Sequence, residues 1–246
     1  MSDTRAEYLS LLFGRRLPDP PSEWRTADLE KIVGHVEGTQ LADAALAALR
    51  ARVDEKIKTF GLPLSDADFA TINRFHRRFV TAGLPLKFQT TGRAPQSYYP
   101  TYRDLLLETD RQGHRWNFLA SEDDFQFVRS LERRDLVIPV VGDLAGPSAL
   151  AEIGRLMSSR GDRLCAFYAS NVEFYLFADG KFPRFVENLE HLPHTDRSVI
   201  IRAVFGGFGQ STPGYYSSSL VQPVDRLLRG YASGSFHSYP ELAVAR

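Results

Sequence analysis

The chain has 246 residues, and its 30 lysines and arginines equal its 30 aspartates and glutamates, so the formal net charge is zero. Because the chain has no excess of basic residues to neutralise nucleic-acid phosphates, we expect no nucleic-acid partner. Cys165 is the only cysteine, which excludes a disulfide within the chain. Because no apolar stretch approaches membrane-spanning length and the start of the chain is polar, we expect a cytoplasmic protein with no membrane contact.

The first third of the chain is predicted to be helical. Between residues 40 and 60, apolar residues recur at steps of three and four, which is the spacing of one stripe on a helix. Ser65 and Asp68 then form a start that resembles a capping box, and an aromatic row continues to a stop at Gly83. We therefore assign residues 1–92 to an N-terminal helical segment that packs on a core formed by the rest of the chain.

Helical and strand-like patterns alternate in the second half of the chain. Short apolar runs at residues 136–141, 163–169 and 198–205 predict buried strands, and helical spacing fills the intervals between them. Alternation at these lengths favours right-handed crossovers in one sheet. We therefore predict that residues 93–246 form a Rossmann-like α/β core with a mostly parallel sheet flanked by helices. A loop rich in glycine and serine at residues 206–219, followed by helices, completes this core.

The turn at residues 142–146, which reads Gly-Asp-Leu-Ala-Gly, directly follows the first of these strands. Ligands of open α/β sheets bind outside the carboxyl ends of the strands. The glycine spacing matches neither a dinucleotide fingerprint nor a P-loop. A phosphate about 4 Å from Asp143 would meet a repulsion on the order of 4 kcal/mol at an effective dielectric near 20. The carboxylate suits an amine, a ribose hydroxyl or a sulfonium, although Asp143 as a helix cap and glycines that permit the turn explain the motif equally well.

Polar residues also follow the next predicted strand and are expected to lie beside this turn. Tyr168 and Glu173 are candidate proton acceptors, whereas Ser170 lacks the surroundings of a nucleophile elbow. Asn171 is equally explained as a helix cap, and Glu173 as a first-turn acid that the helix dipole stabilises. The histidines lack further ligands at metal spacing, so we predict no metal site.

Six short motifs spread over nearly the whole chain carry a family resemblance. They lie at residues 12–15 (Leu-Phe-Gly-Arg), 75–77 (Phe-His-Arg), 98–102 (Tyr-Tyr-Pro-Thr-Tyr), 118–121 (Phe-Leu-Ala-Ser), 139–147 and 167–177. Together they resemble an uncharacterised, mainly bacterial protein family whose core is similar to class I S-adenosylmethionine-dependent methyltransferases.

The resemblance implies S-adenosylmethionine as a cofactor and methyl transfer assisted by Tyr168 or Glu173. The residues that it implies for cofactor binding are Gly142, Asp143, Gly146, Ser170 and Asn171. Two positions depart from the methyltransferase pattern: a glycine precedes the acid of the first turn, and no acid ends the second strand. We therefore expect a methyltransferase-like protein that binds a small nucleoside-type or amino-acid-type ligand at the strand ends. The alternative is a non-catalytic binding or interaction module that has lost the cofactor site, and the oligomeric state is open.

Overall fold

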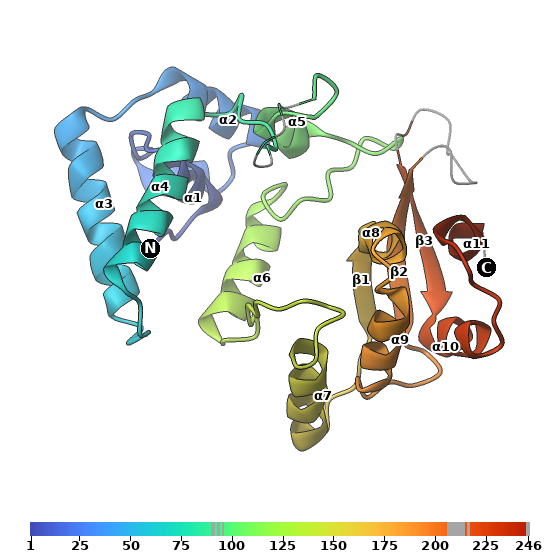
Figure 1. Cartoon of the computed structure of the whole chain (residues 1–246). Coiled ribbons are helices and arrows are strands. Elements are labelled where there is room, and N and C mark those ends of the chain that lie inside the picture. Colours follow the sequence, from blue (N-terminus) through green and yellow to red (C-terminus); the bar gives the residue numbers. More distant parts are fainter. Residues whose placement is uncertain (90–91, 93, 95, 206–214, 216, 245–246) are drawn as a thin grey trace. The chain divides into compact units, whose positions relative to one another are not determined.

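The structure, a computed structural model, describes residues 1–246 apart from 90–91, 93, 95, 206–214, 216 and 245–246. The chain divides into two compact units, Met1–Ile138 (unit 1) and Pro139–Arg246 (unit 2), each with its own hydrophobic core (Figure 1). The division that we expect at residue 92 falls inside unit 1. Among the described residues, no helix is both long enough and apolar enough to cross a bilayer.

The regular elements described in unit 1 are helices, and one isolated antiparallel bridge joins Lys87 to Thr101. The elements of unit 1 are α1 (Arg5–Leu12), a 3-10 turn η1 (Pro21–Trp24), α2 (Leu29–Gly38), α3 (Asp43–Lys58), α4 (Asp66–Ala82), α5 (Tyr102–Leu107) and α6 (Glu122–Arg133). Capping boxes start α1 at Thr4, α4 at Ser65 and α5 at Thr101, so each hydroxyl satisfies an amide that has no partner within the helix. The helix predicted between residues 40 and 60 and the cap at Ser65 are confirmed.

A buried arginine joins α1 to two other segments of unit 1. The guanidinium of Arg5 donates hydrogen bonds to the carbonyl oxygens of Leu119 at 2.6 Å, Ala120 at 2.5 Å and Ala27 at 2.5 Å. Burial lowers the pKa of Arg5, and the nearby carboxylate of Glu122 acts in the opposite direction. The start of α1 is therefore held against the segment that leads into α6 by a charged group inside the core.

Unit 2 combines helices with a three-stranded sheet. Its elements are α7 (Ala149–Arg160), β1 (Ala166–Ser170), α8 (Val172–Ala178), α9 (Phe182–Glu190), β2 (Val199–Phe205), β3 (Ser217–Pro223), α10 (Val224–Ala232) and α11 (Tyr239–Val244). The strand order is β1-β2-β3, with β1 parallel to β2 and β2 antiparallel to β3 (Figure 1). The predicted strands near residues 163–169 and 198–205 and their parallel pairing are confirmed.

The sheet of unit 2 has one covered face. Ile200, Arg202 and Val204 alternate along β2 and are buried, because residues two apart on a strand point to the same face. Apolar residues of α8, α9 and α10 join Ile200 in one core cluster. On the opposite face, Tyr168 of β1 and Val221 of β3, which flank Ile201, are 66% and 62% exposed. Helices of unit 2 therefore do not flank both faces.

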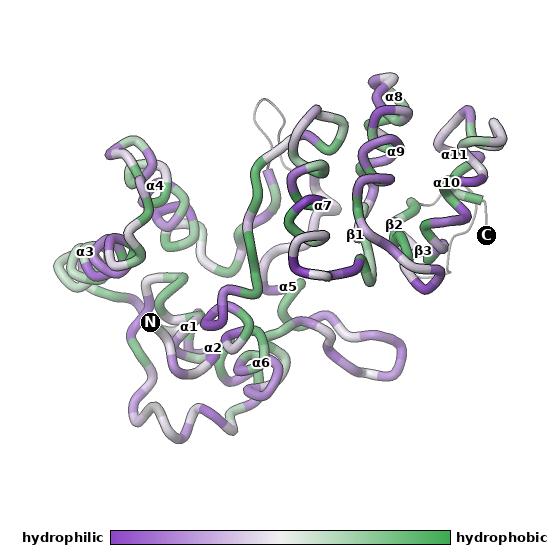
Figure 2. The backbone as a smooth tube through the Cα atoms, turned by 90° about the horizontal axis from the view of Figure 1, so that it is seen from below, coloured by the Kyte–Doolittle hydropathy of each residue, from purple (hydrophilic) through white to green (hydrophobic). Residues whose placement is uncertain are grey.

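The prediction of a mostly parallel Rossmann-like sheet is wrong. The sheet has three strands of mixed direction, and residues 136–141, predicted as its first strand, form no strand. Their apolar side chains are exposed, from 46% at Val137 to 102% at Val141. Figure 2 shows this apolar stretch between α6 and α7. Pro139 lacks the N–H that a central strand must donate, and no strand in the described part of the chain pairs with the segment.

The third strand arises where the sequence predicts a loop. Residues 217–219 of the predicted glycine- and serine-rich loop begin β3, whereas residues 206–214 and 216 lie outside the described residues. Serine has no strong preference for strands, so the local sequence does not predict β3. The strand forms because it pairs with the edge of β2 that β1 leaves free. Every residue of β2 from Val199 to Phe205 has a partner in β3.

A close approach at Gly154 of α7 gives a testable expectation. A Cβ atom at Gly154 would lie 2.2 Å from the carbonyl oxygen of His191, a backbone atom just after α9. We expect Gly154→Ala to destabilise unit 2 by about 1–3 kcal/mol through overpacking. The control is Gly34→Ala in α2, where the added methyl meets no atom within 4 Å and should raise helix stability by up to about 1 kcal/mol. Urea unfolding followed by circular dichroism measures both, and equal stability of Gly154→Ala and the unmodified chain would contradict the packing of α7.

Candidate functional site

The turn predicted to hold a ligand is closed by contacts within unit 2. One carboxylate oxygen of Asp143 accepts a hydrogen bond from the amide of Ala145 at 2.9 Å, and the other accepts one from Lys181 Nζ at 3.3 Å. The hydrogen bond from Ala145, followed by that from Lys181, lowers the pKa of Asp143. A Cβ atom at Gly142 would lie 2.4 Å from the Cβ of Ala149, so the close approach of α7 requires this glycine.

A buried amide from α9 holds the same turn. Asn188 Nδ2 donates hydrogen bonds to the carbonyl oxygens of Leu144 at 2.8 Å and Gly146 at 2.7 Å. At Gly146, a Cβ atom would lie 3.0 Å from the carbonyl oxygen of Asp143. The acid and both glycines thus have structural partners that explain them, and their role in cofactor binding stays a prediction.

The end of β1 brings together the polar residues predicted there. Ser170 has a φ of +50°, in the left-handed region, and the register of β1 against β2 shifts between Tyr168 and Ser170. Asn171 occupies the N-cap position of α8, but its side chain makes no capping hydrogen bond. The cavities that we describe all lie in unit 1, so they do not test Ser170 and Asn171, and the role of both residues in ligand binding also stays a prediction.

Glu173, a candidate proton acceptor, is fully buried against Arg202. Arg202 Nε and Nη2 donate to the two carboxylate oxygens at 2.6 and 3.1 Å, and Nη1 donates to Gln222 Oε1 at 3.0 Å. This arrangement satisfies both buried charges, as a buried ion pair requires. Tyr168, the other candidate, lies on the exposed face of the sheet. The structure therefore places the two candidate catalytic residues on opposite sides of the sheet.

Sequence reasoning missed Arg202, although a signal for it exists. Arg202 is two residues from both Ile200 and Val204, so strand periodicity places it on their buried face. A charged side chain on an apolar face needs a buried partner of opposite charge. The same argument identifies an acid on a neighbouring element, here Glu173, as that partner.

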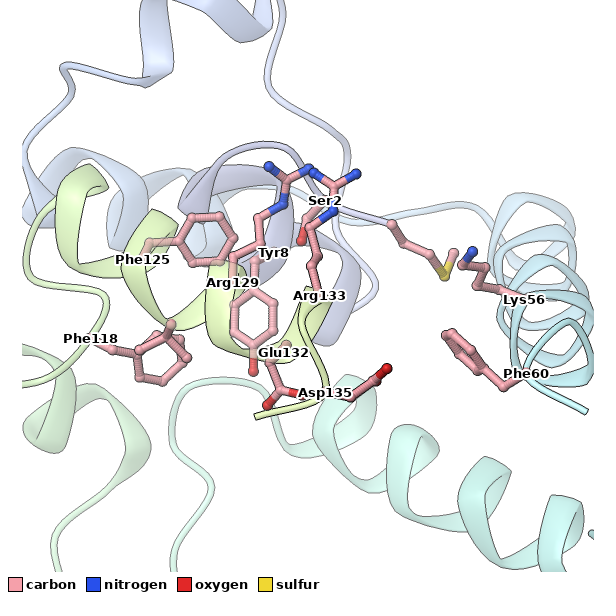
Figure 3. A pocket seen from close by; sticks show the side chains of 12 residues that line it. Ser2, Tyr8, Lys56, Phe60, Phe118, Phe125, Arg129, Glu132, Arg133 and Asp135 are labelled. Atoms are coloured by element: carbon pink, nitrogen blue, oxygen red, sulfur yellow. The ribbon is translucent and has the colours of Figure 1, made fainter. Parts of the chain in front are cut away.

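The largest cavity that we describe lies in unit 1 and has a volume of about 690 Å³. This volume is within the range of roughly 300–1,000 Å³ that is typical of small-molecule sites. Rings of Tyr8, Phe118, Phe125 and Phe60 contribute to its wall (Figure 3). The ring of Tyr8 lies 5.9 Å from those of Phe118 and Phe125, with interplanar angles of 69° and 48°. These angles favour attraction between ring edges and faces, which fixes the wall.

Charges of opposite sign border this aromatic wall. The guanidinium groups of Arg129 and Arg133 lie on one side of the Tyr8 ring in Figure 3, and the carboxylates of Glu132 and Asp135 lie on the other. All four residues lie on α6 or within two residues of its end, so this segment presents both signs of charge to the cavity. The cavity can therefore orient a molecule that carries both charges.

Some of the charged side chains that line the cavity already form an ion pair within the protein, and others do not. Arg129 pairs with Asp3 at the rim. No ion pair among the described residues involves Glu132, Arg133 or Asp135. Lys56, which also lines the cavity, is in none of these ion pairs either, and its ammonium lies 5.2 Å from the centre of the Phe60 ring. These four side chains are the charged groups that the cavity offers to a ligand.

Tyr8 supplies a hydroxyl group on the side of the cavity where Glu132 lies (Figure 3). Burial raises the pKa of its hydroxyl, and the nearby carboxylate of Glu132 raises it further. The group therefore stays protonated at neutral pH and can donate to an acceptor atom in the cavity.

Residues from distant parts of the chain form this cavity, which is why sequence reasoning missed it. Tyr8 comes from α1, Phe60 follows α3, and Phe118 precedes α6. The available signal is on α6, where Phe125, Arg129 and Glu132 follow helical spacing and share one face. In the described part of the chain, no three side chains of His, Cys, Asp or Glu are arranged to hold a metal ion.

Comparison with known proteins identifies a family but no activity. A family model described as a domain of unknown function, DUF7790, matches residues 86–229. The matched region begins in unit 1 and ends in unit 2. No match to a curated protein was found. The expectation of an uncharacterised family is thus confirmed, without support for a methyltransferase core, and the chain belongs to the DUF7790 family.

Proposed function

We propose that this chain is a non-catalytic binding protein whose unit 1 cavity takes a small molecule with an aromatic ring and an amino-acid end. The observation that supports this proposal is the separation of charges across an aromatic wall. An ammonium group of the ligand would face Glu132 and Asp135, and its carboxylate would face Arg133. The ring would pack on Tyr8 and Phe118, where stacking and burial of apolar area both favour binding.

The proposal keeps the nucleoside-type or amino-acid-type ligand expected from the sequence, but at another site. Asp143, the acid expected to contact S-adenosylmethionine, already accepts hydrogen bonds from Ala145 and Lys181, which favours looking for the ligand elsewhere. S-Adenosylmethionine has an adenine ring and an amino-acid end, so we retain it as a ligand to be tested at the cavity. We propose binding without catalysis because Glu173 is sequestered with Arg202. A cytoplasmic location is part of the same proposal.

Titration calorimetry with probes of matched shape tests the proposed ligand class. L-Tryptophan carries both charges, tryptamine only the ammonium, and indole-3-propionate only the carboxylate. We expect L-tryptophan to bind about tenfold or more tightly than either analogue, because each charge-assisted hydrogen bond contributes roughly 1.5–3 kcal/mol. S-Adenosylmethionine and S-adenosylhomocysteine, titrated in parallel, show whether a nucleoside ring is preferred.

Variants of α6 assign the binding to the cavity. Glu132→Gln and Arg133→Gln should each weaken binding of L-tryptophan about tenfold. Asp123→Asn and Arg134→Gln make the same chemical changes at exposed positions that do not line the cavity, and they should leave binding unchanged. Binding that is equally tight for all four variants, equal affinity for the three indoles, or no binding of any probe would each contradict the proposal.

A further inference from the structure

Two hollows adjoin each other on α4, away from the cavity of unit 1 described above. One has a volume of about 270 Å³ and is walled by apolar and aromatic groups, among them Phe79, Phe88 and Leu105. The other, of about 380 Å³, lies over the arginines of α4. Both include Phe75 and Arg78, so they form one continuous surface. We call it the α4 surface, and its principal residues are Arg74, Phe75, Arg77, Arg78, Lys87 and Phe88.

Large apolar groups of the α4 surface are exposed. Phe75 and Phe88 are 59% and 63% exposed, and Leu105 is 50% exposed. None of the residues of α4 is buried, although α4 has 17 residues and a clear apolar row. A contiguous apolar surface of this kind marks an interaction site more often than single exposed residues do.

The three arginines of the α4 surface have no acidic partner in an ion pair, whereas Lys87 is close enough to Asp104 to help lower the pKa of that carboxyl group. Arg78 Nη2 donates to Gln89 Oε1 and Lys87 Nζ to the carbonyl oxygen of Ser97, both at 3.1 Å, and both acceptors are neutral. Among the described residues, no ion pair within 4.0 Å involves Arg74, Arg77, Arg78 or Lys87, and no acid lines either hollow. Elsewhere on the surface, arginines pair with acids, as Arg103 does with Glu37. In a chain of zero net charge, the α4 surface is therefore a local concentration of positive charge.

We propose that the α4 surface binds an acidic peptide segment of a partner protein, with one aromatic or long aliphatic side chain as its anchor. The apolar hollow accepts the anchor, and Arg74, Arg77 and Arg78 meet the carboxylates beside it. Charge complementarity is the argument for this occupant, because three arginines without an ion-pair partner line a recess that no acid lines. An apolar anchor in a pocket, surrounded by polar contacts, is the usual arrangement of such interfaces.

Other anionic partners fit the α4 surface less well. A membrane surface is broad, whereas the apolar groups here line a recess that suits one inserted side chain. Single-stranded nucleic acid stacks successive bases on ring faces, but the rings of Phe88 and Tyr99 meet at 70°, edge to face.

Fluorescence anisotropy with the full chain tests the proposal. The probe is a fluorescein-labelled peptide with one tryptophan between two runs of three glutamates, and its control has alanine in place of tryptophan. We expect the tryptophan peptide to bind more tightly than the alanine peptide, with an affinity that falls as salt rises. The triple variant Arg74→Gln/Arg77→Gln/Arg78→Gln should bind the peptide about tenfold more weakly. Phe75→Ala should reduce binding of the tryptophan peptide without changing that of the alanine peptide.

A matched variant and two competing ligands make the test decisive. Arg155→Gln/Arg160→Gln/Arg184→Gln makes the same change in charge at exposed positions of unit 2, and it should bind the peptide as the unmodified chain does. Phosphatidylserine vesicles and oligothymidylate serve as the alternative ligands. The proposal is overturned if the two triple variants bind the peptide with the same affinity, or if the peptide does not bind the unmodified chain. It is also overturned if the vesicles or the oligothymidylate bind the α4 surface more tightly than the peptide does.

Discussion

Arg202→Met is expected to destabilise unit 2 by about 3–5 kcal/mol, because it leaves the carboxylate of Glu173 buried without its partner. This loss is a large part of the 5–15 kcal/mol or so that stabilises an average domain. Trp24 and Trp116, the two tryptophans of the chain, both lie in unit 1, so their fluorescence does not report on unit 2. Hydrogen exchange at the amides of β1 and β2 measures the effect directly.

The matched control removes both charges of the buried pair. Glu173→Met/Arg202→Met leaves no unpaired charge, and we expect it to recover most of the stability lost in Arg202→Met alone. Gln222 loses its hydrogen-bond donor in both variants, so the difference between them isolates the cost of the buried carboxylate. If the amides of β1 and β2 exchange equally fast in the single and double variants, the ion pair does not organise this core.

Arg5→Met is expected to destabilise unit 1 by roughly 3 kcal/mol or more, because three backbone carbonyls lose their buried donor. Each buried acceptor left without a hydrogen bond costs about 1–3 kcal/mol. Arg5→Lys should give an intermediate loss, since one ammonium group cannot reproduce the planar set of donors. Tryptophan fluorescence during urea unfolding reports on unit 1, which contains both indoles.

Arg16→Met is the control for the effect at Arg5. Arg16 is exposed, so its replacement should change the stability of unit 1 by less than about 0.5 kcal/mol. A loss of stability in Arg5→Met no larger than that in Arg16→Met would show that the contacts of Arg5 with Leu119 and Ala27 do not hold α1 in place.

Helix positions could be predicted because their signals are local. The capping box of Ser65 and Asp68 starts α4, and Gly161 ends α7 in the left-handed conformation with a φ of +73°. Each signal involves residues within one turn of the helix that it starts or ends. The apolar run at residues 136–141 is different, because a strand exists only where another strand pairs with it.

The contacts of the candidate site at residues 142–146 could not be predicted from the sequence for a similar reason. Sequence reasoning located a turn before a helix at residues 142–146, and the structure has one there. The partners of that turn, Lys181 and Asn188, lie about 40 positions further along the chain, and no local pattern relates them to Asp143. Whether Asp143 is available to a ligand therefore depends on how α9 packs.

The sequence by itself determined the zero net charge, the capped helices and the strands β1 and β2, because composition, capping and periodicity are short-range properties. Tertiary structure alone decided the mixed sheet, the pairing of Glu173 with Arg202 and the cavity around Tyr8. These features depend on contacts between residues far apart in the chain, such as the 114 positions between Arg5 and Leu119. Burial and charge pairing are properties of such contacts, and they give the buried Arg5 and Arg202 the hydrogen-bond partners that a buried charge requires.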